Sequence, residues 1–473
     1  MRSMFVDREE ELSRLETLYD SDEPELAVVY GRRRVGKTAL VLESIDGRDE
    51  AVYHQAVETT EADQIDAFVE DSAEVYPTVQ NLRKDWETVL SYLVDEDAVV
   101  VLDEFPYLVE GDESLPSRIQ RLWDHETEDS SATLVLTGSS VGMMYEIALG
   151  GGAPLYGRVS KSPNGRIELR ELGVGSASEF YPAYDPEETV MAYSVFGGVP
   201  HYLQIVDDSA PLGENVTRTV LSPQGGLHDE PETVLRMELD EVNRYFAVLR
   251  SVAKGNRERN EISQATGIPS SDLSYYFERL DTLGILRRDV PVTADPKKTK
   301  STRYRMNDGF FRFWFRFVYG QESRYSGYGE GAYEDLIEPE MAEFASETFE
   351  ELCQEAVPHL YPSLNLVRTP GKWWRKGREV DVVGLTDDVL ILGEAKFTSE
   401  PLGYDVLKRL VEDDAEEVER SAGGGDYEHE YALFSRSGFS RSVREEAKES
   451  EDLSLFSIAD VLDSLGLSDR GEI

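Results

Sequence analysis

The sequence predicts an α/β protein whose first half is built on a parallel sheet and whose second half holds smaller domains. The chain has 473 residues, more than one hydrophobic core usually organises. Wholly apolar runs at 26–30 and 98–102 are typical of strands buried on both faces of a parallel sheet. Later in the chain, helical stripes are followed by pairs of strands. We place the parts at residues 1–165, 166–235, 236–320 and 335–473.

Acidic residues dominate the composition: 94 Asp and Glu stand against 48 Lys and Arg, a net charge of -46. They occur throughout the chain, so a single acidic tail is not the cause. Such a surface repels itself and nucleic acid at low salt, but at 1 M salt the Debye length is only about 3 Å. We interpret the acidity as the signature of a halophile. On this interpretation the acidity gives no information about binding partners. Clusters of basic residues are therefore more informative here than usual.

Several classes of protein are disfavoured by the sequence. No apolar stretch approaches membrane-spanning length, and no apolar segment of a secretory signal follows the first methionine. We therefore expect a cytoplasmic protein with no membrane partner. Cys353 is the sole cysteine, which excludes an intramolecular disulfide and a cysteine-based zinc site.

A glycine-rich loop follows the first predicted strand and opens a helix. Residues 31–38 read G-x-x-x-x-G-K-T, and this strand–loop–helix context favours a phosphate-binding loop over a chance pattern. The backbone N–H groups would wrap the phosphates, Lys37 would reach the β- and γ-phosphates, and Thr38 would bind Mg²⁺. The sequence thus predicts ATP and Mg²⁺ as ligands. The predicted nucleotide-binding residues of the loop are Gly31, Arg32, Arg33, Arg34, Val35, Gly36, Lys37, Thr38 and Ala39.

Polar residues also follow two other predicted strands. Asp103 and Glu104 end the run at 98–102; alone they would be a solvated strand end, but beside the loop they suggest catalysis. We expect Asp103 to hold Mg²⁺ with Thr38, and Glu104 to polarise the attacking water. After the third predicted strand, Ser139 is our candidate for sensing the γ-phosphate. Thr137 competes for that role, and capping of the next helix is the alternative for both.

Together with residues 5–12, these motifs resemble the archaeal ATPase family, of the AAA+/STAND branch of P-loop NTPases. The resemblance covers residues 1–230 and implies an ATPase core at 1–165 with a helical lid at 166–235. It further implies that Phe5 and Arg8 lie near the adenine, that Arg158 acts on the phosphates and that Pro200 closes over the nucleotide. A structural salt bridge is the alternative for Arg158.

Residues 236–320 predict a winged helix followed by an aromatic linker helix. Three helical segments, two of them closed by Gly267 and Gly284, precede a basic hairpin. Cations in such a wing favour DNA binding, while the alternative is a protein-interaction module, as in STAND-type ATPases. The hairpin cations are Arg287, Arg288, Lys297, Lys298, Lys300, Arg303 and Arg305. The aromatic run at 310–319 predicts a buried helix rather than a platform for stacking bases.

Carboxylates at strand positions characterise the last part of the chain. Glu394 and Lys396 are two residues apart and so project from one face of a predicted strand. Asp381 lies on the neighbouring predicted strand. Asp381 and Glu394 can hold a divalent metal, while Lys396 orients water and stabilises developing negative charge.

This D…E-x-K pattern resembles the PD-(D/E)xK nuclease superfamily. The resemblance implies a restriction-endonuclease-like α/β domain at 335–473, with Glu350 as the first acidic position and a second divalent metal. Val380 stands where the proline of the name is expected. A degenerate domain that binds nucleic acid or protein without cutting is the alternative. A local basic patch could contact a phosphate backbone, and it consists of Lys372, Arg375, Lys376 and Arg378 with Trp373 and Trp374 between them.

These parts predict an ATP-binding protein whose Mg²⁺-dependent hydrolysis serves nucleic-acid processing, defence or a mobile element. The expected partners are ATP, DNA, and a second copy or another protein. One alternative is a STAND-like signalling switch whose C-terminal domain recruits partners without cutting. Another is a nucleotide-binding module without turnover.

Overall fold

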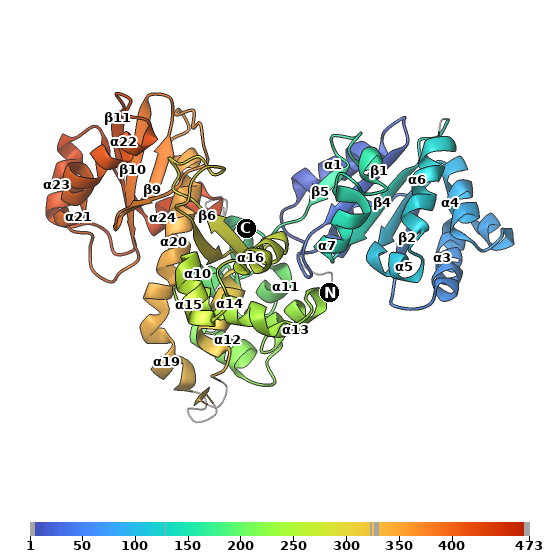
Figure 1. Ribbon diagram of the computed structural model, residues 1–473, viewed down its shortest axis with the longest axis horizontal. Helices are drawn as coiled ribbons and strands as arrows, with labels where there is room; N and C mark the ends of the chain where they lie inside the picture. The colour runs from blue at the N-terminus through green and yellow to red at the C-terminus, as the bar shows by residue number, and fades with distance from the viewer. Residues whose placement is uncertain (1–4, 128, 322–323, 326–330, 468–473) are drawn as a thin grey trace. The chain divides into compact units, whose positions relative to one another are not determined.

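The computed structural model describes residues 5–127, 129–321, 324–325 and 331–467 and divides into two compact units, Met1–Glu171 and Leu172–Ile473 (Figure 1). None of the helices in the described ranges is both long enough and apolar enough to span a membrane.

The first unit contains a sheet of five strands in the order β2-β3-β4-β1-β5, and the strands are parallel, as predicted. Its strands are β1 (Glu25–Tyr30), β2 (Ala51–Gln55), β3 (Val99–Asp103), β4 (Thr133–Gly138) and β5 (Arg166–Glu168). The strands are apolar because both faces are covered by helices. The helices are α1 (Glu9–Tyr19), α2 (Lys37–Ser44), α3 (Glu61–Val75), η1 (Pro77–Asn81), α4 (Trp86–Asp95), α5 (Phe105–Gly111), α6 (Leu115–His125), α7 (Val141–Met144), η2 (Tyr145–Leu149) and α8 (Tyr156–Val159).

Successive residues of β1 show how the two faces are filled. Val28 belongs to one buried cluster with Phe68 of α3 and Trp86 of α4, and Val29 to another with Leu15 of α1 and Leu40 of α2. Because β1 and β3 both pair in parallel with β4, the carboxyl ends of these strands share one edge of the sheet. Ligands of such sheets bind at that edge.

The second unit begins with helices and one antiparallel hairpin. These elements are α9 (Val174–Ser178), α10 (Pro186–Phe196), α11 (Pro200–Leu203), α12 (Leu212–Val216), η3 (Thr217–Leu221), α13 (Glu230–Glu238), α14 (Asn243–Ala253), α15 (Arg259–Thr266), α16 (Leu273–Thr282), β6 (Leu286–Asp289), β7 (Arg303–Met306), α17 (Gly309–Phe313) and η4 (Trp314–Val318). Helices α14 to α16 followed by β6 and β7 have the order expected of a winged helix, an assignment that stays a prediction. Phe310, Phe311 and Phe313 are fully buried, which confirms the prediction of a buried aromatic helix.

A mixed sheet of order β12-β11-β10-β9-β8 completes the second unit. β8, β9 and β10 are antiparallel neighbours, and β10, β11 and β12 run parallel. The elements are α19 (Ala332–Leu336), α20 (Glu338–Leu360), β8 (Gly371–Arg375), β9 (Arg378–Leu385), β10 (Val389–Lys396), α21 (Tyr404–Arg409), η6 (Leu410–Asp414), α22 (Ala415–Ala422), β11 (Glu428–Ser435), α23 (Arg441–Glu449), β12 (Leu453–Ser457) and α24 (Ile458–Ser464). α20 covers one face, where its Phe349 shares a buried cluster with Val382 of β9, while α21 and α22 cover the other.

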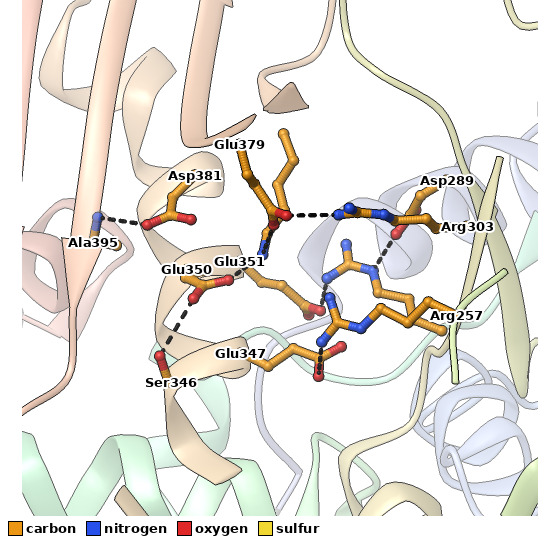
Figure 2. Close-up of polar contacts among 12 residues, drawn as sticks. Arg257, Asp289, Arg303, Ser346, Glu347, Glu350, Glu351, Glu379, Asp381 and Ala395 are labelled. Atoms are coloured by element: carbon orange, nitrogen blue, oxygen red, sulfur yellow. Dashed lines mark hydrogen bonds and ion pairs between the residues drawn. The ribbon is translucent and has the colours of Figure 1, made fainter. Parts of the chain in front are cut away.

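Ion pairs join α20 and β9 to the β6–β7 hairpin and to Arg257, whose carbonyl oxygen accepts a hydrogen bond from Tyr304 of β7. We call the hairpin together with Arg257 the β6–β7 hairpin region. Arg257, before α15, pairs with Glu347 of α20 at 2.9 Å, and Arg303 of β7 pairs with Glu379 of β9 at 2.7 Å (Figure 2). Arg312 also pairs with Glu347, at 3.4 Å. Burial raises the pKa of Glu347, but Arg312 and Arg257 outweigh it, so the pKa lies below its usual range.

We expect Glu347→Ala to lower the free energy of unfolding by about 3–5 kcal/mol, because it leaves two poorly exposed guanidiniums without their carboxylate. The pKa of Glu347 is depressed in the folded state, so this stability is present above its unfolded value of about 4.3 and is lost as pH falls below it. Denaturant unfolding between pH 3 and pH 7 measures it. The matched control is Glu343→Ala on the same helix, whose 77% exposed side chain pairs with Arg316. Equal losses in the two variants would contradict this account.

Candidate functional site

The glycine-rich loop between β1 and α2 requires glycine at both fixed positions of its motif, Gly31 and Gly36. A Cβ at Gly31 would come within 2.2 Å of the Leu169 carbonyl oxygen, so only glycine fits there. Gly36 has φ 100°, in the left-handed region, at the N-cap of α2. Lys37 is buried, and its Nζ donates to the carbonyl oxygens of Gly31 and Arg32, both at 2.9 Å. The ammonium is therefore held against the loop.

Asp103, at the end of β3, connects three neighbouring segments. Its Oδ2 accepts hydrogen bonds from the Thr38 hydroxyl and the Tyr53 hydroxyl, each at 2.8 Å, and its Oδ1 accepts one from the Thr137 hydroxyl. Asp103 is fully buried, and these donors compensate for the lost hydration of its charge. The structure thus brings Thr38 and Asp103 together. A hydroxyl beside a carboxylate fits Mg²⁺, which takes few protein oxygens and completes its shell with phosphates and water.

Glu104 is held by the end of β4. It has φ 54°, in the left-handed region, where a non-glycine residue stores strain. Its carboxylate accepts a hydrogen bond from the Ser139 amide at 3.1 Å and another from the Ser139 hydroxyl. The N-cap residue of α7 is Ser140, so neither Ser139 nor Thr137 takes the capping alternative. Each of the two candidate sensors is bound to one of the two acids.

Two residues with predicted roles near the adenine lie beside the loop. Phe5 packs on the buried cluster that contains Val35 and Leu169. Arg8 is buried and donates to the carbonyl oxygens of Arg170 at 2.6 Å and Val35 at 3.4 Å. Arg8 contacts the loop at Val35, Phe5 packs on the cluster to which Val35 belongs, and contact of either residue with adenine stays a prediction.

Other predicted residues have protein partners. Arg32 pairs with Glu171 at 2.6 Å, and Arg33 donates to the Tyr107 hydroxyl at 3.2 Å. Arg158 pairs with Asp124, with 2.9 Å between Nε and Oδ1. That pair corresponds to the structural alternative, and a catalytic role for Arg158 stays a prediction. Pro200 begins α11 in the second unit.

Tyr53 contacts Asp103, and the sequence did not indicate this contact. Tyr53 lies on β2, which pairs with β3, and its hydroxyl donates to Asp103. Burial first, and then the neighbouring Asp103, raise its pKa, so the hydroxyl stays protonated and donates. Only the lateral order of the strands, which no local motif encodes, places it there.

The C-terminal carboxylates meet at the end of β10. Lys396 Nζ lies 2.8 Å from Glu394 Oε2 and 3.1 Å from Asp381 Oδ2, and both carboxylates are buried. Asp381 also accepts a hydrogen bond from the Ala395 amide at 3.2 Å (Figure 2). Arg409 of α21, which the sequence did not single out, lies 2.9 Å from Glu394 Oε2. Burial, followed by the charge of Asp381, raises the pKa of Glu394 to about 7.

Glu350 of α20 belongs to the same neighbourhood. It accepts hydrogen bonds from Lys372 and, at 3.3 Å, from Ser346; burial and the charge of Asp381 raise its pKa. Among the described residues no donor reaches Glu394 Oε1, although this oxygen is buried. Such an orphaned oxygen fits a divalent cation. The same residues contain no group of three or more His, Cys, Asp or Glu side chains placed to hold a metal, so two carboxylates are the candidate ligands.

Comparisons with known proteins were made for the whole chain. Residues 5–206 match a family model described as an ATPase domain predominantly from Archaea, and residues 314–417 match one described as archaea bacterial proteins of unknown function. The uncharacterized protein MJECL04 of Methanocaldococcus jannaschii is 31% identical over 463 residues, 97% of this chain and 100% of that protein. The solved Walker-type ATPase of Pyrococcus abyssi has a TM-score of 0.50 at 19% identity, covering 67% of this chain and 97% of its own, a likeness of fold alone.

We expect Tyr53→Phe to lower kcat for ATP about 3- to 10-fold with KM changed less than twofold, because one hydrogen bond that positions Asp103 is lost. Steady-state ATPase kinetics measure it. Tyr76→Phe is the matched control, since that hydroxyl donates to the Glu50 carbonyl oxygen on the surface. A Tyr53→Phe enzyme with unchanged kcat would show that the contact positions nothing.

Proposed function

The chain belongs to the family of its Methanocaldococcus jannaschii relative, and its residues 5–206 match an archaeal ATPase domain; from this premise we propose that ATP hydrolysis controls a nucleic-acid-processing site in the C-terminal half. The N-terminal unit is a P-loop ATPase domain that binds ATP. The observation that carries the proposal is the meeting of Lys396 with the buried carboxylates of Asp381 and Glu394.

In the proposed ATPase cycle, Lys37 turns from the loop carbonyls to the β- and γ-phosphates, and Thr38 and Asp103 hold Mg²⁺. The metal, when bound, neutralises charge that develops on the phosphates. Glu104 orients the attacking water. The hydroxyl of Ser139 donates to Glu104 in this structure; transfer of that donor to the γ-phosphate would release the carboxylate for the water.

In the proposed processing site, Asp381 and Glu394 would hold a divalent cation, which would supply a polarised water. Attack by that water on the phosphorus of a phosphodiester would break the bond to the leaving sugar oxygen, which would take a proton from solvent. Lys396 donates to the oxygens on which negative charge develops. The orphaned Oε1 of Glu394 supports a cation there. Glu350, whose pKa is raised by the charge of Asp381, adds a third carboxyl group to the proposed processing site.

Coupling of the two activities would run through the second unit. Arg303 and Arg257 attach the β6–β7 hairpin region to β9 and α20, on which Glu350 lies. A shift of the predicted winged helix would therefore act directly on elements of the carboxylate site.

A second candidate function is a regulatory switch that recruits partners without cutting. Lys396 and Arg409 both contact Glu394 Oε2 and offset part of its charge, which competes with the binding of a cation there. The wing arginines Arg303 and Arg305 pair with carboxylates, which competes with contacts to DNA phosphates. These pairs favour a protein-interaction module over a DNA-reading one.

We expect cleavage of DNA with Mg²⁺ or Mn²⁺ at molar KCl, and a loss of about 100-fold or more in Glu394→Ala and Lys396→Ala. ATP hydrolysis should persist in both variants, because the P-loop domain is untouched. Glu445→Ala on α23, which removes an exposed carboxylate paired with Arg441, is the matched control. Cleavage that is absent, or unchanged in both variants, would refute the nuclease and favour the switch.

A further inference from the structure

A cavity of about 600 Å³ lies between the segment after β6 and the start of β8. It is lined by five basic side chains and one acidic one: Arg287, Arg288, Arg305, Arg368, Lys372 and Asp289. Its volume lies within the range of about 300–1,000 Å³ that is usual for small-molecule sites.

The charge of this cavity is the reverse of the chain's. The sequence has 94 acidic residues to 48 basic ones, whereas the charged lining is five basic residues to one acidic. A concave region in which one sign of charge predominates raises the local potential and attracts counter-ions. The cavity is therefore suited to an anion on a protein whose surface otherwise repels anions.

Two arginines of the cavity are not neutralised by carboxylates. Arg288 donates to the Pro296 carbonyl oxygen at 3.2 and 3.3 Å, and Arg368 donates to the carbonyl oxygens of Val292 and Ala294, both at 2.9 Å. Neither has an ion pair with any residue that the structure describes. A guanidinium has five N–H donors, so each arginine keeps donors for a ligand.

The remaining cations are shared with acidic neighbours. Arg287 and Arg305 both pair with Asp289, at 3.1 and 2.7 Å, and Arg305 also pairs with Glu351. Lys372 pairs with Glu350, the acid beside Asp381, and with Glu379 at 3.5 Å. A ligand in the cavity would therefore contact, through Lys372, the neighbourhood of the carboxylate site.

We propose that this cavity binds the phosphate of a nucleotide, carried either by a single nucleic-acid strand or by a free nucleotide. The planar donor forks of Arg288 and Arg368 match phosphate oxygens, and two arginines give the orientation that one cannot. The proposal deepens the proposed function, because a strand seated here would lie beside the processing site. It rests on the proposed function only for the cleavage of a bound strand, since binding itself requires no cleavage.

The test is binding of fluorescent oligothymidylate and of thymidine monophosphate to the full chain in EDTA, where metal-dependent cutting cannot occur. We expect Arg288→Gln with Arg368→Gln to weaken binding about tenfold or more. The slope of log affinity against log salt for the oligonucleotide should become shallower by about 0.7 to 1.4, the share of one or two phosphate contacts. Arg368→Lys, which keeps the charge, should lose less than Arg368→Gln.

Arg441→Gln on α23 is the matched control, since it removes one charge from a 91% exposed side chain outside the cavity. Circular dichroism shows whether the double variant is folded. If the double variant is unfolded, Arg288→Gln alone, which leaves the Arg368 contacts intact, replaces it in the test.

Loss of oligonucleotide binding identifies a strand as the source, and loss of monophosphate binding alone identifies a free nucleotide. Unchanged affinity for both ligands, or no binding by the parent chain, would overturn the proposal. Failure of cleavage with binding intact would refute the proposed nuclease only.

Discussion

The first unit depends on one buried carboxylate. Asp103 lies at the end of the central strand β3 with no exposed surface, where an uncompensated charge would be costly. Three hydroxyls compensate it, and they come from the phosphate loop, from β2 and from β4. The need to satisfy this charge therefore fixes the relative positions of the loop and the strand ends. The same oxygens include the proposed magnesium ligands of Thr38 and Asp103.

A related constraint operates in the second unit. Buried acids there are held by arginines and lysines, as in the contacts of Lys396 with Asp381 and Glu394 and of Arg257 with Glu347. Breaking such a pair leaves a charge without compensation, which is destabilising. The ion pairs therefore stabilise the packing of the β6–β7 hairpin region on α20. Against a net charge of -46, the cavity around Arg288 and Arg368 is the exception, because its cations exceed its acids.

Local pattern predicted the features that depend on consecutive residues. The loop at 31–38, the buried strand before Asp103, and the strands carrying Asp381 and Glu394 follow from apolar runs, glycine positions and a two-residue period. Tyr53 and Arg409 could not be found this way, because their roles depend on which strands are neighbours and where α21 packs. The lid and winged-helix boundaries stay predictions, since one buried core runs through both regions.

The account stands on a nucleotide site in which Lys37 and the Thr38–Asp103 pair act together. Calorimetric titration of the chain with ATP and Mg²⁺ at molar KCl tests this most directly. We expect Lys37→Ala to weaken ATP binding at least about tenfold, since charge-assisted contacts to the phosphates are lost. Affinity undiminished in that variant would contradict the assignment of the loop as the phosphate site.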